Sequence, residues 1–214
     1  MFENFDFRNL LLMVVPVLLA FTVHEYAHAL AAYKLGDSTA KNEGRLTLNP
    51  LVHLDPVGTL VLFVSQLVGW PKPTPFNPAN FRNPARDATL VALAGPVSNL
   101  ITAVLVAIVF KLFVSFNLFQ LVPRSSIRDL FDIFSLAILI NVSIGVFSLL
   151  PLPPLDGFAV LSYFLPGRLV ATIYQNSTAF FVGFLVLIVL GLPQKVIGPV
   201  IYFLQSIIYQ AILV

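Results

Sequence analysis

Charged residues and cysteine are what this sequence lacks. Only 10% of its 214 residues are charged and none is cysteine, whereas 58% are hydrophobic. A soluble domain usually carries about 25% charged residues, so this chain has too little polar surface to fold alone in water. The absence of cysteine excludes disulfides, thiolate metal sites and cysteine nucleophiles. The small net charge of +2 is spread over loops, which argues against a nucleic-acid partner.

Long apolar runs make up most of the sequence. They cover residues 9–34, 56–70, 88–114, 129–155, 177–193 and 196–213. Five of these runs are long enough to span a bilayer as a helix, which takes about 17–25 residues. The run 56–70 is shorter and ends in a proline-rich linker, so we predict a re-entrant or half-membrane segment there. The first run precedes no small-residue cleavage site, so we expect a retained helix.

We therefore predict an all-α polytopic membrane protein in which residues 1–214 form a single domain. About five helices span the membrane, and the segment 56–70 enters it without crossing. Gly44 and Arg45 precede a short alternating stretch, "RLTL", so we also consider a short membrane-embedded β element near residues 44–50. The edge of such a strand would suit an extended substrate peptide.

Ionisable side chains interrupt the first apolar run in the stretch "VHEYAHA". A charge within a bilayer is costly, so such a group indicates a functional site. His24 and His28 are four residues apart and therefore share one face of a helix. Two imidazoles placed in this way can bind one zinc ion, and Glu25 beside them can take a proton from a metal-bound water.

A zinc site needs a third protein ligand besides two histidines. His53, Asp55 and Asp156 are the candidates. Asp156 follows three prolines that break a long apolar run, and Gly157 next to it allows the chain to turn sharply. An aspartate at such a broken helix end can reach a neighbouring helix at membrane depth. A solvated aspartate in a helix-ending turn would show the same pattern.

Together these stretches resemble the site-2 protease family of intramembrane zinc metalloproteases (peptidase family M50), in its short form without PDZ or CBS domains. The similar pieces lie between residues 20 and 161 and read "FTVHEYAHALAAYKLGD", "GRLTLNPLVHLDPVGTL", "GWPKPTPFNPANFRNP", "ALAGPVSNL" and "LLPLPPLDG". The resemblance implies that His24, His28 and Asp156 bind one zinc ion per chain. It also implies that Glu25 is the general base.

Four further residues are candidates for holding the substrate or the transition state. The resemblance implies a structural or substrate-facing role for Asn99, in "GPVSN". Family members usually carry asparagine where this chain has Ser148, a shorter side chain with a hydroxyl instead of an amide. Asn141 matches the family pattern and could share in holding the substrate. His53 either faces the zinc cavity and stabilises the transition-state oxygen, or caps backbone groups in its loop.

The zinc hypothesis also constrains the topology. The histidines lie beyond the midpoint of the first helix and Asp156 follows the run 129–155, so both helix ends must lie on one side of the membrane. This requires that residues 56–70 do not cross. The active-site side then holds seven of the twelve lysines and arginines and the other side holds five. Under the positive-inside rule this excess predicts an active site that faces the cytoplasm, in a bacterial inner membrane.

We therefore expect a zinc-dependent intramembrane endopeptidase that hydrolyses peptide bonds in or near the transmembrane segments of membrane proteins, in regulated intramembrane proteolysis. Its partners are the lipid bilayer and single-span substrates, with no nucleic acid. Ser148 keeps open an alternative, a catalytically impaired zinc-binding homologue that binds membrane helices. A metal transporter is a weaker alternative, because a transport pathway needs polar residues at several depths and the sequence shows one cluster.

Overall fold

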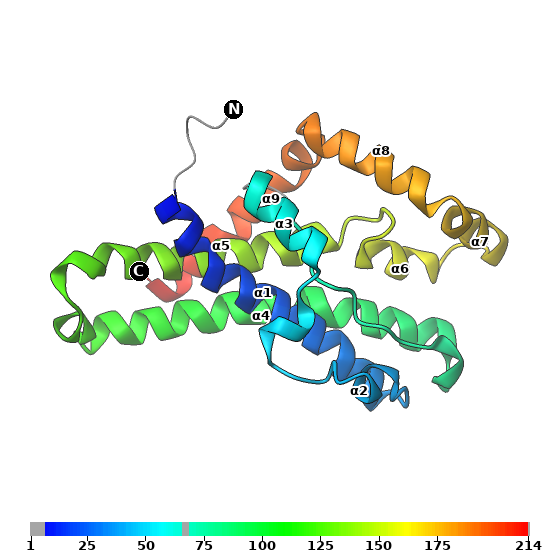
Figure 1. Ribbon diagram of the computed structural model, residues 1–214, viewed down its shortest axis with the longest axis horizontal. Helices are drawn as coiled ribbons and strands as arrows, with labels where there is room; N and C mark the ends of the chain where they lie inside the picture. The colour runs from blue at the N-terminus through cyan, green and yellow to red at the C-terminus, as the bar shows by residue number, and fades with distance from the viewer. Residues whose placement is uncertain (1–6, 66–68, 214) are drawn as a thin grey trace.

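The computed structural model describes residues 7–65 and 69–213, and its regular elements are helices (Figure 1). The α-helices are α1 (Phe7–Lys34), α2 (Thr39–Asn42), α3 (Pro56–Ser65), α4 (Pro84–Ser115), α5 (Ile127–Ser148), α6 (Asp156–Ser162), α7 (Gly167–Gln175), α8 (Ser177–Val189) and α9 (Leu192–Ile208). The short 3-10 turns are η1 (Pro50–His53), η2 (Pro78–Asn80), η3 (Leu118–Leu121) and η4 (Arg124–Ser126), and a π turn, η5 (Tyr209–Leu213), follows α9.

Four helices, α1, α4, α5 and α9, are long and apolar enough to cross a membrane. The predicted run 177–193 forms only the 13 residues of α8, about 20 Å at 1.5 Å per residue. It supplies a fifth span if α7, bent from it by 72°, is counted with it. Outward-facing side chains such as Leu105 and Val109 are large and apolar, as expected next to lipid. The prediction of an all-α polytopic membrane protein is confirmed.

Helix α3 is too short to cross the bilayer. Its 10 residues extend about 15 Å, half of the roughly 30 Å hydrocarbon core. Asp55, the residue before α3, caps the N-terminus of the helix, because its carboxylate accepts the Gly58 N–H at 2.7 Å. By its length, α3 is thus the half-membrane helix that was predicted in the segment 56–70. Residues 66–68 of that segment lie outside the described residues.

The predicted β element near residues 44–50 is wrong, because the structure shows no strand in this fully described stretch. Gly44 has a left-handed backbone with φ of +72°, which turns the chain at its start. The Thr47 N–H then donates to the Arg45 carbonyl at 3.0 Å, and the Asn49 N–H donates to the Thr47 hydroxyl at 3.2 Å. These local bonds use the backbone groups that a strand would offer to a partner.

Helices α1, α4 and α5 pack together, and α1 crosses the antiparallel pair of α4 and α5 (Figure 1). Arg8 near the start of α1 pairs with Asp129 and Asp132 near the start of α5, the second at 3.3 Å. Helices α1 and α5 therefore begin on the same side of the bundle and run towards the other side. Helix α4, which comes between them in the sequence, runs in the opposite direction. The ends of α1 and α5 lie on one side, which is the topology that the zinc hypothesis requires.

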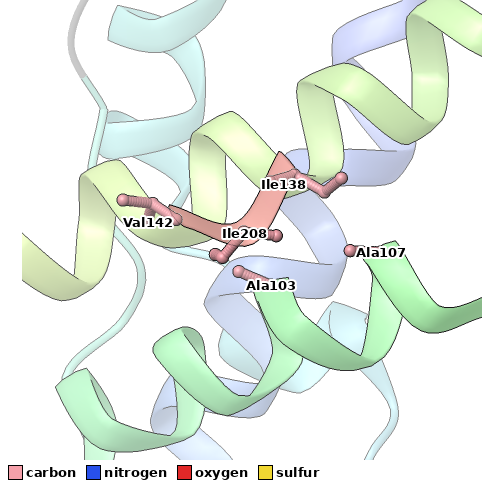
Figure 2. Packing of buried hydrophobic residues seen from close by; sticks show 5 residues of the cluster. All are labelled: Ala103, Ala107, Ile138, Val142 and Ile208. Atoms are coloured by element: carbon pink, nitrogen blue, oxygen red, sulfur yellow. The ribbon is translucent and has the colours of Figure 1, made fainter. Parts of the chain in front are cut away.

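Small residues allow α4 and α5 to approach closely beside the end of α9. Ala103 and Ala107 of α4 are fully buried against Ile138 and Val142 of α5, and Ile208 of α9 completes the cluster (Figure 2). Each pair of residues is four apart and shares one helix face. Lipid tails are as apolar as these side chains, so close van der Waals contact between small residues, rather than the hydrophobic effect, stabilises the helix pair.

Helix α5 ends at Ser148, and a turn rich in proline follows it. The predicted apolar run 129–155 is therefore a helix plus a turn, and Asp156 is the first residue of α6 rather than the end of a long helix. Gly157 is required because the chain passes close to itself. A Cβ on this residue would lie 2.1 Å from the carbonyl oxygen of Leu149.

Asp37 anchors the loops that follow α1 and precede α4. Its carboxylate accepts the backbone N–H and the hydroxyl of Thr39 at 3.1 and 2.6 Å, the Asn80 amide at 2.7 Å and the Asn77 N–H at 2.8 Å. Burial alone would raise the pKa of the Asp37 carboxyl, but these hydrogen bonds outweigh it and hold the pKa below its ordinary value. The anchored loops lie next to the end of α1 that carries the two histidines.

Candidate metal centre

Two histidines of α1 and the first residue of α6 meet at one point. His24 Nε2 lies 3.0 Å from Asp156 Oδ2, and His28 Nε2 lies 3.3 Å from Asp156 Oδ1. One potential ligand atom from each residue lies within 4.8 Å of the other two, and no other such group of three occurs among the described residues. The structure thus brings together the three side chains that the sequence singled out.

The cluster lies inside the apolar bundle. His24 and His28 are only 6% and 7% exposed. Because α1 ends at Lys34, the two histidines lie roughly 15 Å and 9 Å in from that end at 1.5 Å per residue. The hydrocarbon core is about 30 Å thick, so a span that ends at its surface with Lys34 would hold the cluster within the core.

Hydrogen bonds determine which nitrogen of each imidazole carries the proton. His28 Nδ1 lies 2.7 Å from the Val91 carbonyl oxygen, which can only accept, so Nδ1 is the donor. His24 Nδ1 lies 2.6 Å from Asn99 Oδ1. The Asn99 amide nitrogen donates to the Ala20 carbonyl at 3.0 Å, so the amide oxygen is the atom that accepts from His24. Both neutral imidazoles therefore keep a lone pair on Nε2, on the side of Asp156, as metal binding requires.

Asn99 is fully buried and links three helices. Its amide nitrogen donates to Ala20 of α1 and to the Asn141 side-chain oxygen of α5, both at 3.0 Å. The Asn141 amide nitrogen donates in turn to the Ala137 carbonyl at 2.8 Å. An amide left without partners here would cost about 1–3 kcal/mol. Asn99 thus orients His24, and both asparagines connect neighbouring helices.

Gly95 of α4 lies directly against the two imidazoles. A Cβ on this residue would lie 2.4 Å from His28 Nε2 and 2.6 Å from His24 Nε2, where ordinary van der Waals contact begins at 3.4 Å. Any larger residue would therefore displace the histidines. The turn of helix "GPVSN" serves the cluster twice, because its glycine leaves room for both rings and its asparagine orients one of them.

The three donors fit a tetrahedral zinc ion. Bonds of about 2.0–2.1 Å place neighbouring ligand atoms of a tetrahedron about 3.3 Å apart. The two imidazole nitrogens lie 3.0 and 3.3 Å from the two different oxygens of the Asp156 carboxylate, which is close to this value. One ligand atom from each of the three residues lies within 4.8 Å of the other two, so an ion between them requires only small side-chain movements. Two histidines and one carboxylate are also the protein ligands of a class of catalytic zinc sites in which a fourth position is open.

Glu25 is buried beside the cluster and is bound by the loop that precedes α4. The Thr74 N–H donates to Glu25 Oε2 at 2.8 Å, and the Thr74 hydroxyl donates to the Glu25 carbonyl at 3.0 Å. Among the described residues, Glu25 Oε1 has no hydrogen-bond partner. The carboxylate is thus oriented through one oxygen while the other remains available to accept a proton.

Comparison with known proteins agrees with this chemistry. The model of "Peptidase family M50" matches residues 123–190, which include α5 and Asp156. The chain is also 42% identical over 189 residues to the Bacillus subtilis protein "Putative zinc metalloprotease YwhC", covering 88% of this chain and 85% of that protein. The chain belongs to peptidase family M50.

Two further relatives of this M50 peptidase are longer proteins. The Rip2 protein of Mycolicibacterium smegmatis, which carries the same description as YwhC, is 32% identical over 155 residues, 71% of this chain. Rip2 of Mycobacterium tuberculosis is 31% identical over 154 residues, 70% of this chain. In both cases the chain spans only 56% of the relative's length. No solved structure matches the chain.

Ser148, where M50 proteins of this type were expected to carry asparagine, is the last residue of α5. Its hydroxyl donates to the Gly145 carbonyl of its own helix at 3.3 Å, and the residue is buried. A hydroxyl bound in this way keeps only its oxygen lone pairs for another partner. Ser148 therefore offers no free donor to an oxyanion in this arrangement.

His53 and Asp55 lie outside the His–His–Asp cluster. His53 is fully buried, its Nε2 donates to the Thr47 carbonyl at 2.8 Å, and its Nδ1 lies 3.5 Å from an Arg45 nitrogen. Of the two roles weighed for His53, the structure shows the capping of backbone groups. Asp55, the other alternative to Asp156 as a third ligand, caps α3.

Thr74 and Arg45 are the site residues that sequence reasoning missed. Arg45 is 2% exposed, and its guanidinium donates to the carbonyls of Lys72 and Pro73 at 2.6 and 3.3 Å. These bonds hold the extended segment whose next residue, Thr74, binds Glu25. The available signal was the alternation "PKPTP", because prolines on either side leave Thr74 as an isolated N–H donor in an extended stretch.

Proposed function

We propose that this M50 peptidase is a zinc-dependent endopeptidase that cleaves peptide bonds in or near the transmembrane segments of single-span membrane proteins, as in regulated intramembrane proteolysis. The observation that carries the proposal is a His–His–Asp cluster, with a glutamate beside it, inside an apolar helix bundle. Relatives described as zinc metalloproteases support the choice of metal. The depth of the cluster supports the choice of substrate, because a peptide bond must reach it within the bilayer.

In this proposal His24, His28 and Asp156 hold the zinc ion. Bound zinc supplies Lewis-acid chemistry, which acidifies water and polarises a carbonyl group. Glu25 accepts the proton of the attacking water at Oε1, the oxygen without a partner among the described residues, and passes it to the leaving amine nitrogen. The Thr74 N–H stays on Oε2 and keeps the carboxylate oriented during both transfers.

The substrate has to leave its helical conformation before it can be cut. A helix hides its backbone carbonyls in hydrogen bonds, so residues near the scissile bond must unwind at the cluster. Transmembrane segments that contain glycine or other weak helix formers are therefore the expected substrates.

Ser148 favours a second candidate function. Its hydroxyl donates to Gly145 and replaces an amide that could donate to an oxyanion. A chain that binds zinc and membrane helices but cleaves slowly or not at all would fit this observation. The two functions predict the same zinc content and differ in cleavage.

The deciding experiment compares wild type with Glu25→Gln and with the matched control Glu43→Gln, which changes an exposed glutamate next to α2. We expect about one zinc per chain in all three proteins. Cleavage of a panel of single-span substrates in proteoliposomes should be lost only in Glu25→Gln. Zinc without cleavage in any of the three, with Ser148→Asn restoring cleavage, would support the impaired homologue. Wild-type protein purified without chelators that contains no zinc would overturn the proposal.

We also propose that the chain lies in a bacterial inner membrane with its active site towards the cytoplasm, because seven of the twelve lysines and arginines fall on that side. The chain contains no cysteine, so single cysteines can be labelled without background. A membrane-impermeant maleimide added outside cells with a permeable outer membrane should label Ser125→Cys and spare Lys41→Cys. Labelling of Lys41→Cys alone would reverse the orientation.

A further inference from the structure

A polar cavity lies at the end of α1 and the start of α4, and its lining includes none of the metal-centre residues. Its volume is about 430 Å³, and its lining includes Lys34, Arg82, Asn83, Arg86 and Asp87. Pockets of roughly 300–1,000 Å³ are typical of small-molecule sites. None of these residues takes part in the His–His–Asp cluster or in the bonds to Glu25.

The lining of this cavity carries an excess of positive charge. Lys34, Arg82 and Arg86 are exposed, and among residues 7–65 and 69–213 no carboxylate lies within 4.0 Å of any of their nitrogens. The single acid in the lining, Asp87, is 4% exposed and accepts the Asn83 N–H at 3.1 Å. One oxygen of this carboxylate is thus bound to the backbone, and three cations against one acid leave the lining with a net positive charge.

The cavity also lies where the protein leaves the bilayer. Lys34 is the last residue of the span that begins at Leu10, and the span of α4 begins at Pro84. The first N–H groups of a helix have no partner within it, and the helix dipole adds positive potential there. The C-terminal end of α1 and the carboxylate of Asp87 contribute negative potential at the same place, so the attraction for an anion at the membrane surface comes from the three cations.

We propose that this cavity binds a phosphate group, supplied by the headgroup of an anionic phospholipid. Guanidinium groups bind phosphate oxygens with two parallel hydrogen bonds, and ammonium groups bind them as point charges. A bound phosphate would bridge Lys34 of α1 and the two arginines before and within α4. It would thereby connect the helix that carries both histidines to the helix that carries Gly95 and Asn99.

The test uses the full chain in a neutral detergent, with phosphatidylglycerol as the probe and native mass spectrometry to count bound lipids. The cavity variant is Lys34→Gln/Arg82→Gln/Arg86→Gln. The matched control, Lys111→Gln/Arg124→Gln/Arg128→Gln, removes the same charge from exposed residues at the opposite ends of the helices. Circular dichroism checks that both variants are folded. The single variants Arg82→Gln and Arg86→Gln test the same cavity with less disturbance of the fold.

We expect one tightly bound phosphatidylglycerol in wild type and in the control. Its apparent Kd should rise at least about tenfold in the triple cavity variant and about fivefold in each single variant. Displacement of the lipid by millimolar inorganic phosphate would show that the cavity recognises the phosphate group. Binding of inorganic phosphate but not of phosphatidylglycerol would support a phosphate site that is filled from solution. An equal loss in the cavity and control variants, or no loss in the cavity variants, would overturn the proposal.

Discussion

Gly95→Ala should weaken zinc binding strongly while leaving the fold in place. The added Cβ would lie 2.4 Å from His28 Nε2 and 2.6 Å from His24 Nε2, whereas real Cβ contacts are essentially never shorter than 3.0 Å. The imidazoles must therefore retreat by about 0.6 Å and 0.4 Å to reach even that limit. Zinc–ligand distances tolerate changes of about 0.2 Å. A shift of this size places both nitrogens outside the bonding range.

The size of the effect follows from two opposing contributions. Disturbance of the groups around a metal site typically lowers metal affinity about 10–100-fold, and here the ligand atoms themselves are displaced, so we expect the upper end of that range or beyond. Overpacking costs about 1–3 kcal/mol, but replacing a helical glycine by alanine returns about 0.5–1 kcal/mol. The fold should therefore be destabilised by no more than about 2.5 kcal/mol.

The assay is zinc content after equilibration with chelators of graded affinity, together with circular dichroism on the same samples. Gly198→Ala is the matched control, because this helical glycine of α9 has nothing within 4 Å of the added Cβ. The control should hold zinc as wild type does. Wild-type zinc affinity in Gly95→Ala would refute the inference that these histidines hold the metal in the observed geometry.

Substitutions at three other residues test the surroundings of the site. Asn99→Leu removes the acceptor of the His24 Nδ1 proton and should lower zinc affinity about 10–100-fold by chelator competition, whereas Asn99→Asp keeps an acceptor and should lose less. His53→Ala should leave zinc content unchanged and lower the free energy of unfolding by about 1–3 kcal/mol; zinc loss would contradict its position outside the cluster. The pKa of Asp37 is lowered in the folded state, so its stabilisation is present above the unfolded value near ~3.9 and is lost as pH falls through the folded value. Thermal unfolding of wild type should therefore lose stability below about pH 4 more steeply than Asp37→Asn does.

His24 and His28 could be predicted from a short-range pattern, because their spacing places them on one helix face. The prolines before Asp156 made it one of three candidate third ligands, and the resemblance to the family selected it. The even number of membrane crossings between the two helices then followed, because the histidines and the aspartate must lie on the same side of the membrane to bind one ion. None of these steps needed the conformation of a loop.

The bond between Thr74 and Glu25 could not be predicted in the same way. It joins residues 49 positions apart and depends on Arg45, which anchors the linker through two backbone carbonyls. The alternation in "RLTL" suggested a strand, but the pattern does not reveal that a buried guanidinium and a left-handed Gly44 govern this segment. The end of α5 at Ser148 was missed for a related reason, because apolar composition continues through the turn that follows it.

The packing of the bundle and the geometry of the metal centre depend on each other. Asn99 reaches His24 on α1 and Asn141 on α5 at the same time, which is possible only where the three helices approach closely. Gly145 permits that approach, since a Cβ there would lie 3.1 Å from the Pro96 carbonyl. In water, solvent could satisfy such an amide and let the helices separate. In hydrocarbon each polar atom needs a protein partner. A Cβ at Gly145 would require the Pro96 carbonyl to move by a few tenths of an ångström, and any such movement of α4 acts on the bond between Asn99 and Asn141.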